Sequence, residues 1–198
     1  GYSAFAGVPI LFANDDNVPQ ATLTALATLN HPHMYILGPG TIIGEHVVDT
    51  LRHYGVVHRI RGTSPASNSV AFSSYNESGF GWDVYQPGHG LVFLNADQPL
   101  DAAAAAPLSA SGDYGPQLIL NSATTVPGAL TRYLYQLQPG YVANTPGSNQ
   151  VNAVYNHGWI IGDQNAISYG VQAQIDQDLE IKAESQAALS AAASSVGP

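Results

Sequence analysis

The sequence predicts an α/β fold in which parallel sheets are flanked by helices. Short apolar runs without polar alternation, such as Leu91–Leu94, alternate along the chain with segments of helical periodicity. Buried parallel strands have this continuous apolar character, and parallel neighbours need a helical crossover between them. The same order of motifs occurs twice, which predicts two related units in tandem.

The stretch from Met34 to Gly62 contains the clearest unit. An apolar run at 34–37 is followed by the turn Gly38-Pro39-Gly40. Apolar side chains then recur with helical spacing, at Ile43, Val47, Val48, Leu51 and Tyr54. Gly55 ends this helical pattern, and 56–60 has the composition of a second strand. Strand, helix and strand together predict a βαβ unit.

The other elements follow by the same criteria. In the first half of the chain we expect a strand at Val8–Phe12, a helix that opens at Val18-Pro19, a short helix after Ser67, and a loop from Asn76 to Gly90. In the second half we expect strands at Leu91–Leu94, Gln117–Leu120 and Ala153–Ile161, and helices at Pro99–Ala110, after Val126-Pro127 and through Ile167–Leu179.

An internal repeat sets the domain boundaries. Gly38, Ile43, Val47 and Leu51 match Gly162, Ile167, Val171 and Ile175 at one constant offset, and Pro9–Phe12 resembles Pro116–Leu120. We therefore expect a first unit at residues 1–78, N-terminally incomplete, and a second at 79–182. The second unit carries a Pro/Gly/Asn-rich insertion at 138–152, and an Ala/Ser-rich tail covers 183–198.

Composition excludes several classes of function. Five Lys and Arg against 14 Asp and Glu give a net charge of −9. Five dispersed cations cannot supply the phosphate contacts of a nucleic-acid-binding protein. Charged residues are only 10%, against about 25% in typical soluble domains, a composition common in exported surface proteins. The chain has no cysteine and no apolar run near the ~20 residues of a membrane span. It starts abruptly at Gly1, which is compatible with a processed product.

Apolar and glycine motifs recur in the same order in both units. In the first unit they are Gly7–Leu11, Tyr35–Gly38, Ile43-Gly44, Val47-Val48, Leu51, Gly55, Val57 and Arg59–Gly62. In the second unit they are Asp101–Leu108, Pro116–Leu120, Ile160–Gly162, Ala166–Ser168 and Val171. This pattern, which spans roughly residues 7 to 182, resembles the cell wall binding repeat 2 family of bacterial surface proteins.

This resemblance implies Rossmann-like units on a secreted protein that is held non-covalently at the cell wall by anionic wall polymers. Family repeats usually occur in threes around a pseudo-threefold axis, whereas this chain has about two. The chain also departs from the family after Gly62, where Thr63–Ser67 replaces the usual Asp-Arg-Tyr.

Arg59 and Arg61 are the candidate binding residues. They are two positions apart on a predicted strand, so both side chains should point to the same face. One interpretation is that they hold a carboxylate or phosphate of a glycan in bidentate fashion. The other is that they pair with acids at a contact between units, such as Asp101. The sequence leaves both open.

No motif indicates catalysis, a cofactor or a metal. Gly38-Pro39-Gly40 lacks the third glycine of a dinucleotide-binding turn, and Pro39 removes an amide that would face phosphate. The pairs His31/His33 and His46/His53 have no adjacent H-E-x-x-H pattern, and Asn14–Asn17 lacks the spacing of a calcium loop. We therefore expect no enzyme activity.

The leading hypothesis is a non-catalytic exported cell-surface protein that binds wall or surface polysaccharide. The alternative is a self-assembling subunit of an extracellular filament or surface layer, in which copies of the chain form a homo-oligomer or polymer. Abundant Tyr, Asn and Gln would suit subunit contacts.

Overall fold

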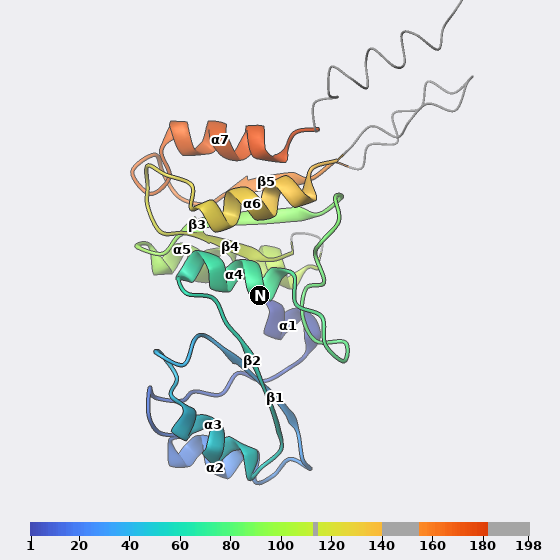
Figure 1. The fold of residues 1–198 in the computed structure, drawn as a ribbon, viewed down its shortest axis with the longest axis vertical. Coiled ribbons are helices and arrows are strands. Elements are labelled where there is room, and N and C mark those ends of the chain that lie inside the picture. The colour runs from blue at the N-terminus through green and yellow to red at the C-terminus, as the bar shows by residue number, and fades with distance from the viewer. Residues whose placement is uncertain (113–114, 140–154, 182–198) are drawn as a thin grey trace, which may run out of the picture.

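The computed structural model describes residues 1–112, 115–139 and 155–181, and it confirms the α/β class (Figure 1). Parallel strands form two small sheets that are flanked by helices. The helices are α1 Tyr2–Ala6, α2 Gln20–Leu26, α3 Glu45–Arg52, α4 Pro65–Ser73, α5 Pro99–Ala110, α6 Gly128–Leu137 and α7 Tyr169–Leu179. The strands are β1 His33–Leu37, β2 Val56–Ile60, β3 Gly90–Asn95, β4 Gln117–Leu120 and β5 His157–Ile160.

The first sheet consists of β1 and β2, paired in parallel from His33 opposite Val56 to Leu37 opposite Ile60. Helices α2 and α3 supply the apolar cover of one face. The buried residues of this small core are Leu26, Ile36, Val47, Val48 and Leu51. The helical spacing seen in the sequence therefore does face the sheet.

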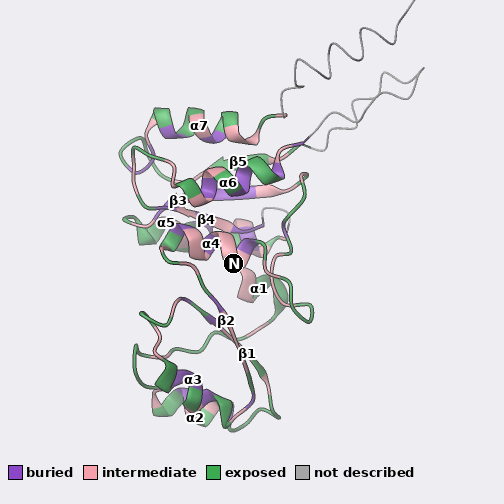
Figure 2. Ribbon diagram, viewed as in Figure 1, coloured by how far each residue is buried: buried purple, intermediate pink, exposed green. Residues whose placement is uncertain are grey.

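The second sheet has the order β4-β3-β5, with all strands parallel and β3 in the centre. Leu91 and Phe93 of β3 pack into the core formed with α4, α6 and α7. Val92 and Leu94 point to the opposite face, where Ala105 of α5 covers them. Because β3 is buried on both faces, its sequence is continuously apolar. Figure 2 shows buried residues concentrated in this part of the fold.

Two helices from the first part of the chain pack on elements of the second unit. Helix α4 lies against β4 and α6, and α1 lies against α5. The Ser69 hydroxyl of α4 accepts a hydrogen bond from the Ile119 amide at the outer edge of β4, at 3.0 Å. The hydroxyls of Ser73 in α4 and Tyr133 in α6 share a hydrogen bond at 2.5 Å. The two units are therefore joined by packing as well as by the chain.

The two glycine turns have the same backbone geometry. Gly38 and Gly162 have φ angles of 139° and 123°, a region in which a side chain would be strained. Each is followed by a turn, and α3 and α7 begin the same number of residues later. The helical spacing in the sequence begins at Ile43 and Ile167, but both isoleucines lie in the turns. The helices themselves begin two residues later, at Glu45 and Tyr169.

The carboxylate of Asp163 holds the second of these turns together. It accepts hydrogen bonds from the amides of Asn165 and Ala166, at 2.9 and 3.0 Å. These two backbone amides, with the Asn165 side chain, hold the pKa of Asp163 below its ordinary value of 3.8.

The prediction of a buried strand at Val8–Phe12 is wrong. This segment is extended but unpaired, and the side chains of Ile10 and Phe12 are 66% and 78% exposed. Its counterpart β4 pairs with β3. The described residues of the first unit contain no counterpart of β3, so Val8–Phe12 has no neighbouring strand to hydrogen-bond with.

The remaining boundaries differ little from expectation. Strand β5 begins at His157, later than the predicted start at Ala153. Ala153 itself lies outside the described residues, as do most of the insertion and the whole tail.

No helix in the described ranges combines the length and hydropathy needed to cross a membrane. The loop at 76–90 contains only one isolated bridge, between Glu77 and Phe80.

The difference between β3 and Val8–Phe12 can be tested with one matched pair of variants. Phe93→Ala should lower the free energy of unfolding by about 3–5 kcal/mol, because it opens a cavity at a fully buried site. Phe12→Ala should change it by less than about 0.5 kcal/mol, because that ring is mostly exposed. Urea unfolding measures both, and equal losses would contradict the unpaired position of Phe12.

A pH series tests the Asp163 turn. Because folding lowers the pKa of Asp163, its ionised form stabilises the native state above the unfolded pKa, and that gain disappears as pH falls through the folded pKa. Asp163→Asn should therefore be less stable than the parent chain at about pH 6 and approach it at about pH 3. Thermal unfolding across this range measures the gap, and a constant gap would contradict the assignment.

Candidate functional site

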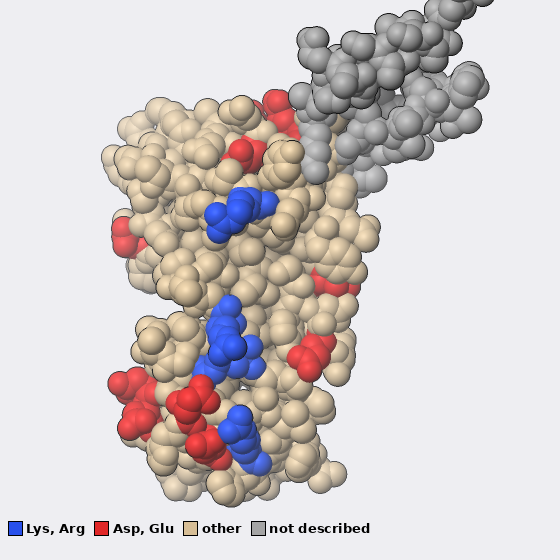
Figure 3. All heavy atoms as spheres, viewed as in Figure 1, with Lys and Arg blue, Asp and Glu red and all other residues tan. Residues whose placement is uncertain are grey.

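Basic side chains follow one face of the molecule from the first unit to the second, and acidic side chains gather near those of the first unit (Figure 3). All the arginines lie in described parts of the chain: Arg52 in α3, Arg59 in β2, Arg61 just after β2, and Arg132 in α6. We call these residues the arginine set. The remaining cation, Lys182, lies outside the described residues.

Arg59 is engaged inside the first unit. Its side chain is only 11% exposed, and Nη2 lies 3.2 Å from Oε1 of Glu45 in the first turn of α3. Nη1 donates to the carbonyl of Gly38, also at 3.2 Å. One guanidinium therefore joins β2 to the glycine turn and to the start of α3, where a carboxylate is favoured by the helix dipole.

Arg61 is placed differently. Strand β2 ends at Ile60, so Arg61 lies beyond the strand, and strand alternation does not decide which way it points. Its side chain is exposed and forms no ion pair with any described residue. The two candidate arginines thus differ in role: Arg59 stabilises the turn, and Arg61 is open to solvent.

Asp101 does not meet either arginine. It lies in the first turn of α5, in the second unit. A Cβ added at Gly162 would come within 3.0 Å of its Oδ2 atom, which places the carboxylate beside the second glycine turn. Among the described residues Glu45, not Asp101, is the acid that pairs with Arg59.

Sequence reasoning missed Arg132. It is exposed on α6 and forms no ion pair with a described residue, whereas Arg52 pairs with Asp49 at 2.7 Å. The helical spacing of the apolar residues could have revealed it. Leu130, Tyr133 and Leu134 mark the buried face of α6, so Arg132 lies on the outward face. Arg61 and Arg132, one from each unit, are therefore the arginines with no acidic partner in the described chain.

An aromatic and histidine cluster lies where the first sheet meets the 76–90 loop. The ring of Tyr35 stacks on Phe80 with centroids 3.7 Å apart, and on His58 at 4.8 Å. Nδ1 of His58 lies 3.0 Å from a carboxylate oxygen of Glu77. Because both neighbours of Tyr35 stack on it, its faces are not open to a sugar ring, and the cluster's role is to hold the loop on the sheet.

Tyr75 completes this cluster. Its hydroxyl donates to the Glu77 carboxylate. Burial, followed by this hydrogen bond to Glu77, raises the pKa of Tyr75 well above its ordinary value. The phenol therefore stays protonated near neutral pH and acts as a hydrogen-bond donor.

The sites considered for metals and phosphates have local structural roles. Asn14 and Asn17 bond to each other through their side chains at 2.8 Å, and the neighbouring Asp15 carbonyl accepts from the Gly44 amide at 2.6 Å. Within the described ranges, no three His, Asp or Glu side chains gather as a metal site would require. At the first glycine turn, the amides of Gly38, Ile42 and Ile43 all donate to backbone carbonyls.

Comparison with known proteins gives a likeness of fold. No protein-family model matches the chain, and no curated protein matches its sequence. Among solved structures, Cwp6 from Clostridium difficile superposes with a TM-score of 0.67 at 18% sequence identity. The match covers 90% of this chain and 25% of Cwp6, so this chain spans about a quarter of that protein's length.

The different roles of the two candidate arginines can be measured by stability. Arg59→Gln should lower the free energy of unfolding by about 1–2 kcal/mol, because a mostly buried guanidinium loses a carboxylate and a carbonyl partner. Arg61→Gln is the matched control and should change it by less than about 0.5 kcal/mol. Denaturant unfolding measures the free energy of unfolding of both variants. Similar losses of stability in both would show that Arg61 also has a structural role.

Proposed function

We propose that this chain belongs to a non-catalytic exported protein that binds cell wall or surface polysaccharide non-covalently through its two units. One observation carries the proposal: the fold resembles that of Cwp6, a cell wall protein, over 90% of this chain. The order of motifs in both units, which resembles the cell wall binding repeat 2 family, supports the same function.

Two members of the arginine set, Arg61 and Arg132, form the proposed contact surface for the polymer. Arg61 and Arg132 are exposed, come from different units, and have no acidic partner among the described residues. A linear polymer with repeated anionic groups would contact both at once, so that two weak contacts add as linked binding events. With a net charge of −9, the attraction is local and should weaken as salt screens it.

Self-assembly remains a second candidate because several large apolar side chains are exposed. The examples are Ile10, Phe12, Ile42, Leu100 and Tyr169, all more than 60% exposed. Exposed apolar side chains favour contacts between copies where they are contiguous. The size of the native particle separates the two candidates.

Co-sedimentation with purified cell walls tests the arginine surface. The double variant Arg61→Gln/Arg132→Gln should lose most of the wall-bound fraction, because it removes the two arginines that have no acidic partner among the described residues. Arg52→Gln is the matched control, since Arg52 is equally a surface arginine but is paired with Asp49. Raising the salt concentration should release the parent chain. A double variant that co-sediments like its parent would exclude this surface as the binding site.

Sedimentation velocity then decides between anchoring and assembly. A monomer or small oligomer in buffer that sediments with added walls supports the anchoring function. Long polymers that form without walls would favour the filament or layer. Hydrolysis of a panel of sugars or nucleotides by purified protein would contradict both, because each is non-catalytic.

A further inference from the structure

Helix α4 belongs to the first unit by sequence, but hydrogen bonds attach it to the second unit. In its first turn the Ala66 amide donates to Oδ1 of Asn121, just after β4, at 3.2 Å. This amide has no carbonyl partner within the helix, so Asn121 satisfies it. One turn later the buried Ser69 hydroxyl accepts from the Ile119 amide of β4 at 3.0 Å. The first half of α4 is therefore fixed to β4 at two successive turns.

The last turn of α4 is attached to α6. The hydroxyls of Ser73 and Tyr133 lie 2.5 Å apart, and both residues are buried. The Tyr133 hydroxyl donates to the Val84 carbonyl at 2.6 Å, so it accepts from Ser73. Because Tyr133 directly follows Arg132 in α6, this contact fixes the part of the helix that carries Arg132.

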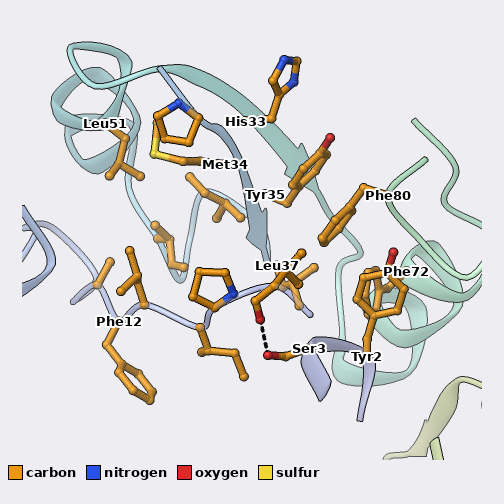
Figure 4. A pocket seen from close by; sticks show the side chains of 18 of the residues that line it. Tyr2, Ser3, Phe12, His33, Met34, Tyr35, Leu37, Leu51, Phe72 and Phe80 are labelled. Atoms are coloured by element: carbon orange, nitrogen blue, oxygen red, sulfur yellow. Dashed lines mark hydrogen bonds between the residues drawn. The ribbon is translucent and has the colours of Figure 1, made fainter. Parts of the chain in front are cut away.

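Aromatic packing holds α4 on the first sheet as well. Figure 4 shows Phe72 of α4, Phe80 of the following loop and Tyr35 of β1 on the same side of β1. The ring centroids of Phe72 and Phe80 are 5.9 Å apart, and those of Phe80 and Tyr35 are 3.7 Å apart. Helix α4 also contacts β2. It is thus fixed to both units at once.

Arg61 is attached to α4 through the residue that follows it. The Gly62 amide donates to Oδ1 of Asn68 at 3.0 Å. A Cβ added at Gly62 would lie 2.2 Å from the backbone nitrogen of Asn68 and 2.3 Å from the carbonyl carbon of Ser67, so the chain lies directly against the helix. Strand β2 holds the other side of Arg61, since it ends at Ile60. The backbone of Arg61 is therefore held between β2 and α4 while its side chain is exposed.

We propose that α4 is a rigid spacer that fixes the distance between Arg61 and Arg132, so that the chain selects linear polyanions by the spacing of their charges. The inference rests on the proposed polymer-binding function and adds a selection rule to it. An oligomer too short to reach both arginines makes one contact, and a longer one makes two linked contacts. Because the spacer is already ordered, the second contact costs little further ordering of the protein. The affinity should therefore rise in one step at the length that spans the two arginines.

Oligogalacturonates of defined length are the probe, because each of their sugar residues carries one carboxylate. Calorimetric titration of the parent chain at low salt should show an affinity that rises by about tenfold or more over one or two added sugar residues. Beyond that length the affinity should change little. The single variants Arg61→Gln and Arg132→Gln should both lose the step and keep the weak binding of the shortest oligomers.

Asn68 is the positioning residue of this site, because it holds the chain after Arg61 on α4. Asn68→Ala should lower the affinity of oligomers longer than the step by about threefold or more, and leave that of shorter ones unchanged. Loss of structure alone would lower the affinity at every length.

An insertion tests the spacer without removing any contact of α4. Two glycines inserted between Arg61 and Gly62 should abolish the step, because they free Arg61 from the helix while Gly62 keeps its bond to Asn68. The same two glycines between Tyr85 and Gln86, which are exposed in the 76–90 loop, are the matched control and should leave the step in place.

Co-sedimentation with purified walls separates this proposal from the function on which it rests. A parent chain that binds walls but shows no step with oligomer length would overturn the spacer and leave the wall-binding function standing. A step that survives the insertion after Arg61 would also overturn the spacer. A parent chain that binds neither walls nor oligomers would overturn both.

Discussion

The parallel pairing of β3 with β4 and β5 is the interaction on which the rest of the second unit depends. Each side of β3 carries part of the core: Leu91 and Phe93 face α4, α6 and α7, and Val92 and Leu94 face α5. Apolar burial on both faces, together with hydrogen bonds at both edges, ties four helices and two strands to one segment. The first unit, whose described residues lack such a segment, has a small core on one face of a two-stranded sheet.

This difference explains how far the sequence could predict the fold. Strands β2 and β4 and helix α5 have their expected bounds because local apolar runs, proline and glycine mark them. Val8–Phe12 has the same local pattern as β4, yet it is not a strand. A strand exists only when a neighbour satisfies its backbone groups, and the presence of that neighbour is not a local property.

The same distinction applies to the arginines. Spacing on a predicted strand singled out Arg59 and Arg61 together, but their environments differ because β2 ends between them. The partner of Arg59, Glu45, lies across the glycine turn, so only the folded turn brings the two together. Helical spacing in α6 could have placed Arg132 on an outer face, but no spacing in the sequence relates it to Arg61. For Arg59, the missing information was the folded position of Glu45 and not the type of either residue.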